Sequence, residues 1–168
     1  MFHLWRRRIN YKKVAFYGKD FGFQAEETFV KSSQHDSGSP IPTLNFDIFP
    51  LISDSNNPSQ GKKGDWDKKM IFQLSKKELP ILCSVLLGYL PKIEIKRPDK
   101  GIEIVRQPGN LFVRASGGKG RLYVLPIDMS DTFQLSSFAL SRLQEQVGGM
   151  DDALLLASLR GAAGLYKA

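Results

Sequence analysis

Basic and aromatic side chains recur together along several short segments of this chain, and the pairing suits one kind of chemistry. Residues two apart on a strand point to the same face. By that rule a ring and a cation share a face in four pairs: Phe112 with Arg114, Arg121 with Tyr123, Lys13 with Tyr17, and Phe29 with Lys31. Cations that follow a phosphate backbone, and flat rings on which bases stack, are what binding of an unpaired nucleic-acid strand requires. The pattern therefore indicates a single-strand-binding surface; a subunit contact or a face covered by helices is the alternative.

Residue patterns typical of enzymes are absent from the sequence. The two histidines, His3 and His35, have no companion at metal-ligand spacing. The lysine–glycine clusters at 61–64 and 117–120 lack the spacing of a phosphate-binding loop, and no helix follows them, which favours hairpin turns. Cys83 is the single cysteine, and it falls on the apolar face of a predicted helix, as a buried small residue would. We therefore expect no catalytic residue, no metal and no cofactor.

Residues 65–79 predict a strand that leads directly into a helix. Met70, Phe72 and Leu74 alternate with more polar neighbours, which is the periodicity of a strand with one apolar face. Ser75 and Glu78 then have the spacing of a capping box, in which each side chain accepts a hydrogen bond from the other residue's backbone N–H. Apolar residues follow at helical spacing from 79 to 86. A strand thus ends, and a helix begins, at one serine.

The same stretch resembles the signature of the Whirly family of single-stranded DNA-binding proteins. The matching residues are Asp65-Trp66, Lys68-Lys69, Leu74-Ser75 and Glu78, and Gly64 replaces the tyrosine with which that signature begins. The resemblance implies two antiparallel four-stranded sheets, a homotetramer, single-stranded DNA as ligand, and Lys68 and Lys69 close to the bound strand. A related fold in kinetoplastid mitochondrial RNA-binding proteins makes RNA the alternative ligand. Trp66 is either a platform for a base or a plug in the core, and we favour the plug.

The remaining elements are predicted from alternation, turn residues and capping residues. Strands are expected at 13–17, 21–31 and 43–49, with loops at 32–42 and 53–64. A second set of strands follows at 92–96, 102–106, 111–115 and 121–127. Asp131 is expected to cap a helix over 132–147, and a final helix runs from Asp151 to about Leu159. The order is ββββα-ββββα with an extra C-terminal helix, so the predicted fold class is α+β.

Composition and charge are consistent with one nucleic-acid-binding domain. The chain has 168 residues, of which 42% are hydrophobic, enough for a single core. We predict a basic N-terminal tail at 1–10 and one domain at 11–168. The net charge is +7, and basic residues outnumber acidic ones at 1–31 and at 92–121, where strands are expected. No apolar run is long enough to span a membrane. A single cysteine fits a reducing compartment. The arginine-rich start, with no acidic residue before Asp20, resembles an organelle transit segment, but a strand is expected from about residue 11 and leaves only about ten residues for it. A cytoplasmic location is therefore favoured, and an organelle matrix is the alternative.

The sequence therefore predicts a non-enzymatic protein that binds single-stranded DNA largely without regard to sequence, in a setting of replication, recombination or repair. The alternatives are binding or annealing of single-stranded RNA, and an oligomeric adaptor that holds a protein and no nucleic acid. The candidate nucleic-acid-binding residues are Lys13, Tyr17, Lys19, Phe29, Lys31, Lys68, Lys69, Lys96, Arg97, Arg106, Phe112, Arg114, Arg121 and Tyr123.

Overall fold

The computed structural model describes residues 12–32, 38–53, 56, 59 and 61–166. The predicted basic tail at 1–10 and both histidines lie outside these residues. The described chain forms two antiparallel sheets, with one helix after the first sheet and two helices after the second. The predicted α+β class and the order of sheets and helices are confirmed.

The first sheet contains the four predicted strands and one short extra strand. Its strands are β1 (Lys13–Tyr17), β2 (Phe21–Val30), β3 (Ile41–Ser53), β4 (Lys62–Gly64) and β5 (Met70–Gln73). The order is β1-β2-β3, and β3 then pairs with β4 at one end and with β5 further along. Residues 62–64 were predicted as loop, and that prediction is wrong. The long strand β3 continues to Ser53, and its exposed end offers backbone groups with which β4 pairs.

The junction between β5 and α1 (Glu78–Leu86) has the predicted capping box. The Ser75 N–H donates to Glu78 Oε1 at 2.9 Å, and the Glu78 N–H donates to Ser75 Oγ at 3.3 Å. The apolar face of α1 is buried, and Gly88 adopts a φ of +83° just after the helix ends. Only glycine adopts that conformation without strain, which explains the end of the helix.

The second sheet is a simple meander. Its strands are β6 (Lys92–Arg97), β7 (Lys100–Gln107), β8 (Asn110–Gly117) and β9 (Leu122–Ile127), paired in sequence order. The helix α2 (Met129–Gln146) begins three residues earlier than predicted. Its cap is Asp128, whose Oδ1 accepts from the Asp131 N–H at 2.8 Å, so the prediction of Asp131 as the cap is wrong. The predicted final helix is present as α3 (Asp152–Ala163), which is capped by Asp151 and extends four residues beyond the predicted end at Leu159.

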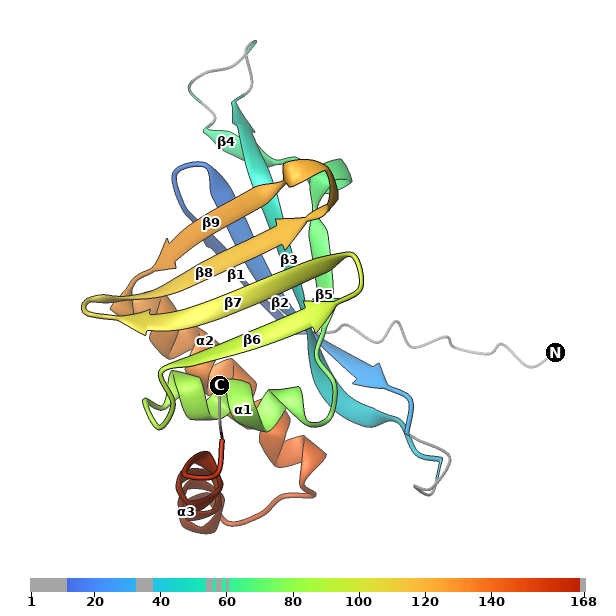
Figure 1. Cartoon of the computed structure of the whole chain (residues 1–168), viewed down its shortest axis with the longest axis vertical. Helices are drawn as coiled ribbons and strands as arrows, with labels where there is room; N and C mark the ends of the chain where they lie inside the picture. The colour runs from blue at the N-terminus through green and yellow to red at the C-terminus, as the bar shows by residue number, and fades with distance from the viewer. Residues whose placement is uncertain (1–11, 33–37, 54–55, 57–58, 60, 167–168) are drawn as a thin grey trace, which may run out of the picture.

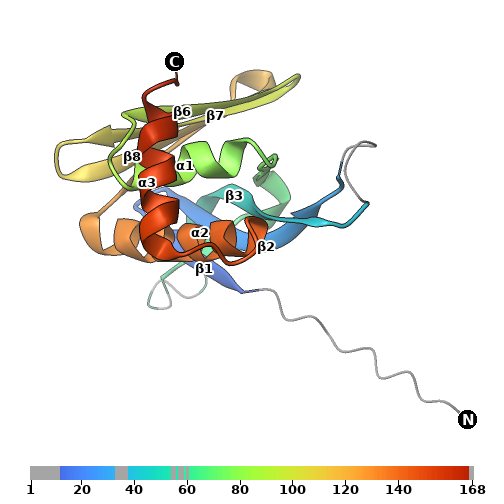
Figure 2. The ribbon, with the colours of Figure 1, turned by 90° about the horizontal axis from the view of Figure 1, so that it is seen from below.

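The two sheets form layers that cross at a steep angle, with the hydrophobic core between them (Figure 1). Figure 2 shows α1 between the layers, with α3 crossing on its outer side. Alternate residues of every long strand face this core, among them Phe23, Phe46 and Ile104, which are fully buried. We call the opposite side of each sheet its outer face. Among the described residues, no helix is long and apolar enough to cross a membrane.

Candidate nucleic-acid interface

Three aromatic rings form a row on the outer face of the first sheet. Phe49 is at the centre, with the Trp66 ring centroid 4.3 Å and the Tyr17 ring centroid 6.2 Å from its own. Phe49 is completely buried beneath its neighbours, whereas Tyr17 is 63% exposed and Trp66 is 44% exposed. The favoured prediction of Trp66 as a core plug is therefore wrong. The outer two rings are held by the central one and present their free surface to solvent, as base-stacking platforms do.

Two glycines make room for the central ring. A Cβ at Gly22, which is paired with Phe49 across β2 and β3, would lie 2.4 Å from Cε2 of the ring. A Cβ at Gly64 would lie 2.8 Å from the same atom. Real Cβ atoms do not approach so closely, so the ring lies directly over two stretches of bare backbone. Gly64 takes the place of the tyrosine with which the Whirly signature begins, and the Phe49 ring fills the space that a side chain at this position needs.

Two consecutive lysines flank this aromatic row. Lys69 Nζ lies 5.5 Å from the Trp66 ring centroid and 3.8 Å from Asp47 Oδ2. Lys68 is well exposed, and its Nζ lies 3.7 Å from Asp65 Oδ2. Because Lys68 is exposed, an ion pair of this length contributes little to stability, so a phosphate can replace the Asp65 carboxylate at small cost. The structure thus places Lys69 beside the aromatic row, with Lys68 next to it in the chain, and their contact with a bound strand stays a prediction.

The second sheet supplies further cations at the same end of the molecule. Tyr123 on β9 donates through its hydroxyl to the Lys68 carbonyl oxygen at 2.8 Å. A Cβ at Gly117, where β8 ends, would lie 3.1 Å from Met70 Sδ on β5. These contacts bring the turn between β8 and β9, which carries the exposed Lys119 and Arg121, beside the start of β5. Positive charge from segments about fifty residues apart therefore gathers beside the rings.

The turn between β1 and β2 completes this region. Lys62 on β4 reaches across to it, donating to the Lys19 carbonyl oxygen and lying 3.7 Å from Asp20 Oδ1. We name the cations at this end the basic corner; they are Lys19, Lys62, Lys68, Lys69, Lys119 and Arg121. Lys13, also predicted, lies on the same outer face at the other end of β1, where it pairs with Glu26.

Three predicted residues lie on the outer face of the second sheet, far from the aromatic row. Lys96 is exposed, with its Nζ 3.5 Å from Glu94 Oε2. Arg114 is exposed opposite Glu103, and Phe112 is half-buried between Val105 and Pro126. The prediction that these side chains turn away from the core is confirmed. They form a second group that is separate from the basic corner.

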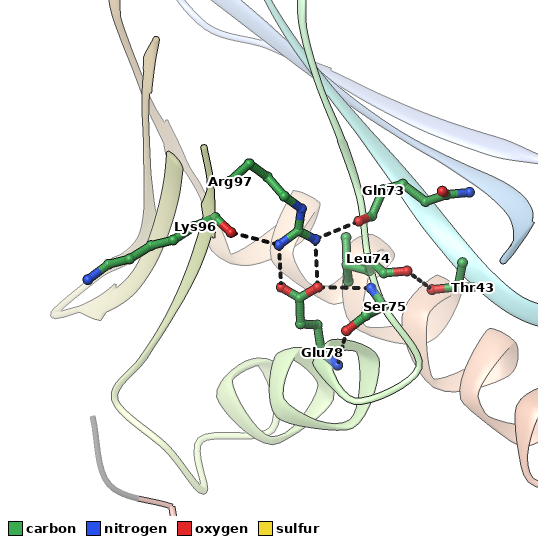
Figure 3. A network of polar contacts seen from close by, with 7 residues as sticks. All are labelled: Thr43, Gln73, Leu74, Ser75, Glu78, Lys96 and Arg97. Carbon is green, nitrogen blue, oxygen red and sulfur yellow. Dashed lines mark hydrogen bonds and ion pairs between the residues drawn. The ribbon is translucent and has the colours of Figure 1, made fainter. Parts of the chain in front are cut away.

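Arg97 holds the two sheets together (Figure 3). Its guanidinium donates to both Glu78 carboxylate oxygens, at 2.7 and 3.2 Å, and to the Gln73 carbonyl oxygen at 2.8 Å. It thereby joins the end of β6 to the strand–helix junction that follows β5. Burial raises the Glu78 pKa, but hydrogen bonds from Arg97 and Ser75 outweigh it and hold the pKa below its usual value. With its donors engaged in this way, Arg97 is a structural residue.

Arg106, Phe29 and Lys31 also lie away from the aromatic row. Arg106 donates to the Val85 and Leu86 carbonyl oxygens at 3.1 and 3.0 Å, where it satisfies the C-terminal end of α1. Phe29 shares a sheet face with Phe23 and Ala25, so it points to the helix side rather than outward, and the Arg142 guanidinium lies 4.7 Å from its ring centroid. Lys31 is exposed just beyond the end of β2.

Tyr123 is the clearest error in the predicted set. It was expected to face solvent beside Arg121, but it is 6% exposed and faces the core with Leu125 and Ile127. Its ring centroid lies 5.0 Å from that of Phe21. The strand begins Leu-Tyr-Val-Leu, so apolar residues occupy both of its faces, and alternation alone does not identify the inner face.

Sequence reasoning missed Phe49 as a candidate site residue, although a signal for it was present. Phe49 follows Asn45 and Asp47 at a spacing of two, so an outward Asp47 implies an outward Phe49. A large ring on a polar face is unusual enough to mark the site. No such signal exists for the exposure of Trp66, because it depends on how the short helix η2 (Trp66–Lys68) lies on β3.

Groups suited to metal binding or catalysis are not found in this region. Among the described residues, no three His, Cys, Asp or Glu side chains are placed to hold a metal ion. Burial raises the pKa of the Cys83 thiol to about 12, so that thiol is not a nucleophile at neutral pH. The arrangement offers rings for stacking and ammonium and guanidinium groups for phosphate contacts, which are the parts of a binding surface.

The sequence matches no protein-family model and no curated protein, whereas the structure has clear relatives. The structure of WHY1 from Arabidopsis thaliana is similar over 94% of this chain and 96% of its own, with 18% identity and a TM-score of 0.62. The structure of WHY3 from the same plant is similar over 93% of this chain and 98% of its own, with 18% identity and a TM-score of 0.61. A chain of a guide-RNA-binding protein complex bound to a guide RNA is similar over 73% of this chain and 92% of its own, with 11% identity and a TM-score of 0.50. The chain therefore has a Whirly-like fold, which confirms the resemblance at the level of the fold.

Proposed function

We propose that this chain binds single-stranded nucleic acid without catalysing a reaction, through the aromatic row and the basic corner. The observation that carries the proposal is the row Tyr17–Phe49–Trp66, whose outer rings are exposed beside cations from both sheets. Bases stack on the exposed rings and phosphates contact the lysines and Arg121. Because every base has a flat face, such binding is largely independent of sequence.

Single-stranded DNA is our first choice of ligand, and RNA is the second. The resemblance of residues 65–78 to the Whirly signature favours DNA. The guide-RNA complex among the similar structures favours RNA, since the same fold there holds an RNA. The two are distinguished by contacts to the 2′-hydroxyl group, which only RNA carries.

The test is fluorescence anisotropy of the full chain with labelled oligonucleotides of equal length: single-stranded DNA, single-stranded RNA and double-stranded DNA. We expect single strands to bind more tightly than the duplex, because paired bases cannot stack on the rings. With about three to five phosphates neutralised, affinity falls roughly twenty- to a hundredfold between about 50 and 200 mM salt. Lack of binding to every oligonucleotide at low salt would overturn the proposal and favour a protein adaptor.

We also propose that the chain self-associates through its helices, as the tetramer implied by the Whirly resemblance requires. Large apolar side chains are exposed there, namely Met129, Phe133, Leu154, Leu156 and Leu165. Large apolar side chains exposed on or just after helices are typical of surfaces that contact another subunit. Light scattering coupled to size exclusion measures the mass; a monomer at micromolar concentration would contradict this part of the proposal. For the location of the protein, we favour the cytoplasm over an organelle matrix.

A further inference from the structure

A buried carboxylate lies in the outer face of the first sheet, one row along from the aromatic rings. Asp47 is two residues before Phe49 on β3, so both side chains point to this face. Asp47 pairs with Gln24 on β2 and with Ile71 on β5. It is 6% exposed. We call the side chains of Asp47, Gln24 and Asn45, which share this face, the polar floor of the first sheet.

Polar groups on this floor are left incompletely paired. Asp47 has one ion-pair partner among the described residues, Lys69, at 3.8 Å. The Asn45 Oδ1 atom is buried without a hydrogen-bond partner, and no hydrogen bond joins the Gln24 side chain to another described residue. Buried polar groups are nearly always hydrogen-bonded, so an unpartnered Asn45 Oδ1 two residues from a buried carboxylate calls for an explanation. A ligand that supplies the missing donors is one.

The Asp47 carboxylate costs the protein free energy while the site is empty. Burial raises its pKa above the ordinary value, Lys69 opposes that shift, and Glu26 adds to it. A raised pKa means that the charged form is less stable here than in water. The carboxylate is therefore not explained by a contribution to the stability of the fold at neutral pH.

Lys69 and Asp47 together present one donor followed by two acceptors. The ammonium group donates, and the two carboxylate oxygens accept. The pairing edge of guanine has the complementary order: the O6 acceptor, then the N1–H and the N2 amino group as donors. Lys69 also lies 5.5 Å from the Trp66 ring centroid, so the polar pair is next to an exposed stacking platform. A base stacked at the aromatic row has its edge within reach of this pair.

We propose that Asp47 and Lys69 form a guanine-reading subsite beside the aromatic row. The inference rests on the proposed function and adds a base preference to an otherwise sequence-tolerant surface. The carboxylate accepts from N1–H and the N2 amino group, and the ammonium group donates to O6. Thymine presents one donor between two acceptors, and adenine and cytosine each place an acceptor against the carboxylate. Only guanine offers two adjacent donors, so the other bases lose at least one of these bonds.

The experiment measures anisotropy of the full chain with single-stranded DNA of about ten nucleotides in which thymine alternates with guanine, inosine, adenine or cytosine. We expect the guanine series to bind at least about fivefold more tightly than the adenine series, since a bidentate base contact is worth about 1–3 kcal/mol. Inosine lacks the N2 amino group, so its affinity falls between the two. Asp47→Asn removes one acceptor and the charge, and we expect it to abolish the guanine preference.

Asp65→Asn is the matched control. Like Asp47→Asn, this substitution removes a carboxylate charge next to a lysine, since Asp65 Oδ2 lies 3.7 Å from Lys68 Nζ. Asp65 also lies at the same end of the molecule as Asp47. It is expected to bind all four series slightly more tightly and to keep the preference for guanine. Equal affinities of the unaltered chain for all four series, or a preference that survives in Asp47→Asn, overturn the subsite and leave the proposed function intact. Absence of binding in all four series overturns both.

Discussion

Both sheets are antiparallel, but their outer faces have very different chemistry. On the first sheet, rings from β1, β3 and η2 are in contact, and most of the nearby cations lie at one end. On the second sheet, Lys92 lies 2.9 Å from Glu94 and 3.6 Å from Glu103, and Lys96 lies 3.5 Å from Glu94. The carboxylates of the second sheet thus neutralise lysines of their own face. Phe112 there is half-buried and has no ring beside it among the described residues.

This difference indicates that a basic sheet is not by itself a ligand surface. Cations already paired across strands must leave their carboxylates when a phosphate binds, whereas the basic corner has Lys119 and Arg121 with no ion pair among the described residues. Rings bind bases only where they are exposed and held in place. Both conditions are met where the aromatic row and the basic corner lie together, and the following predictions test whether the outer face of the second sheet lacks them.

The largest effect is expected when both exposed rings are removed from the first sheet. Tyr17→Ala combined with Trp66→Ala should weaken single-strand binding by about 1–3 kcal/mol for each stack removed. The measurement is anisotropy with thymine oligonucleotides, after circular dichroism has verified the fold. Phe112→Ala is the matched variant on the second sheet and should change affinity little. A larger effect of Phe112→Ala would move the site to the second sheet.

The next effect concerns the tie that fixes the two sheets relative to each other. Glu78→Gln removes the charge that receives Arg97 and weakens the capping box, so we expect a loss of about 1–3 kcal/mol in the free energy of unfolding at neutral pH. Because the folded-state pKa of Glu78 is lowered, its stabilisation is present above the unfolded-state value of about 4.5 and is lost as the pH falls through the folded-state value. Urea unfolding of the unaltered chain and of Glu78→Gln at pH 7 and at pH 3 measures the loss and its pH dependence. An equal loss in the free energy of unfolding at the two pH values would contradict the ion-pair explanation.

A smaller effect on single-strand binding is expected when cations are removed. The salt dependence of the affinity then distinguishes the basic corner from the outer face of the second sheet. Lys68→Ala with Arg121→Ala should reduce the slope of log affinity against log salt by about 0.7 for each phosphate that the variant no longer neutralises. Lys92→Ala with Lys96→Ala removes the same charge from the second sheet and should leave that slope unchanged. Anisotropy titrations at four or more salt concentrations give the slopes. Equal reductions in the two double variants would mean that both faces contact the strand.

The smallest expected change is in stability, at the polar floor of the first sheet. Since burial raises the Asp47 pKa, the charged form destabilises the fold at neutral pH and the protonated form does not. Asp47→Asn should therefore raise the unfolding temperature at pH 7, and this gain should disappear as the pH falls below the unfolded-state value near 3.8. Glu103→Gln on the second sheet should show no such gain. A less stable Asp47→Asn variant at pH 7 would show that the ion pair with Lys69 outweighs burial.

Much of the fold was predictable because its signals are local. Alternation in residues 13–17, 43–49 and 92–96, the Ser75–Glu78 capping box, and glycine after α1 each depend on neighbouring residues. The errors occurred where a local pattern had two solutions: two aspartates three residues apart could each begin α2, and Leu122–Ile127 is apolar on both faces. The choice was made by packing, which buries Tyr123 against Phe21 and leaves Leu122 outside.

The sequence by itself determined the strands, the helices, the positive charge, and the motif that resembles the Whirly signature. Tertiary structure alone decided which cations are engaged between distant segments of the fold and which stay exposed for the ligand that we propose. Arg97 and Arg106 have the same charge as Arg121, but their donors face carboxylate and carbonyl oxygens brought close by folding. A guanidinium group binds whichever acceptors lie within about 3 Å, and those neighbours exist only once distant segments meet.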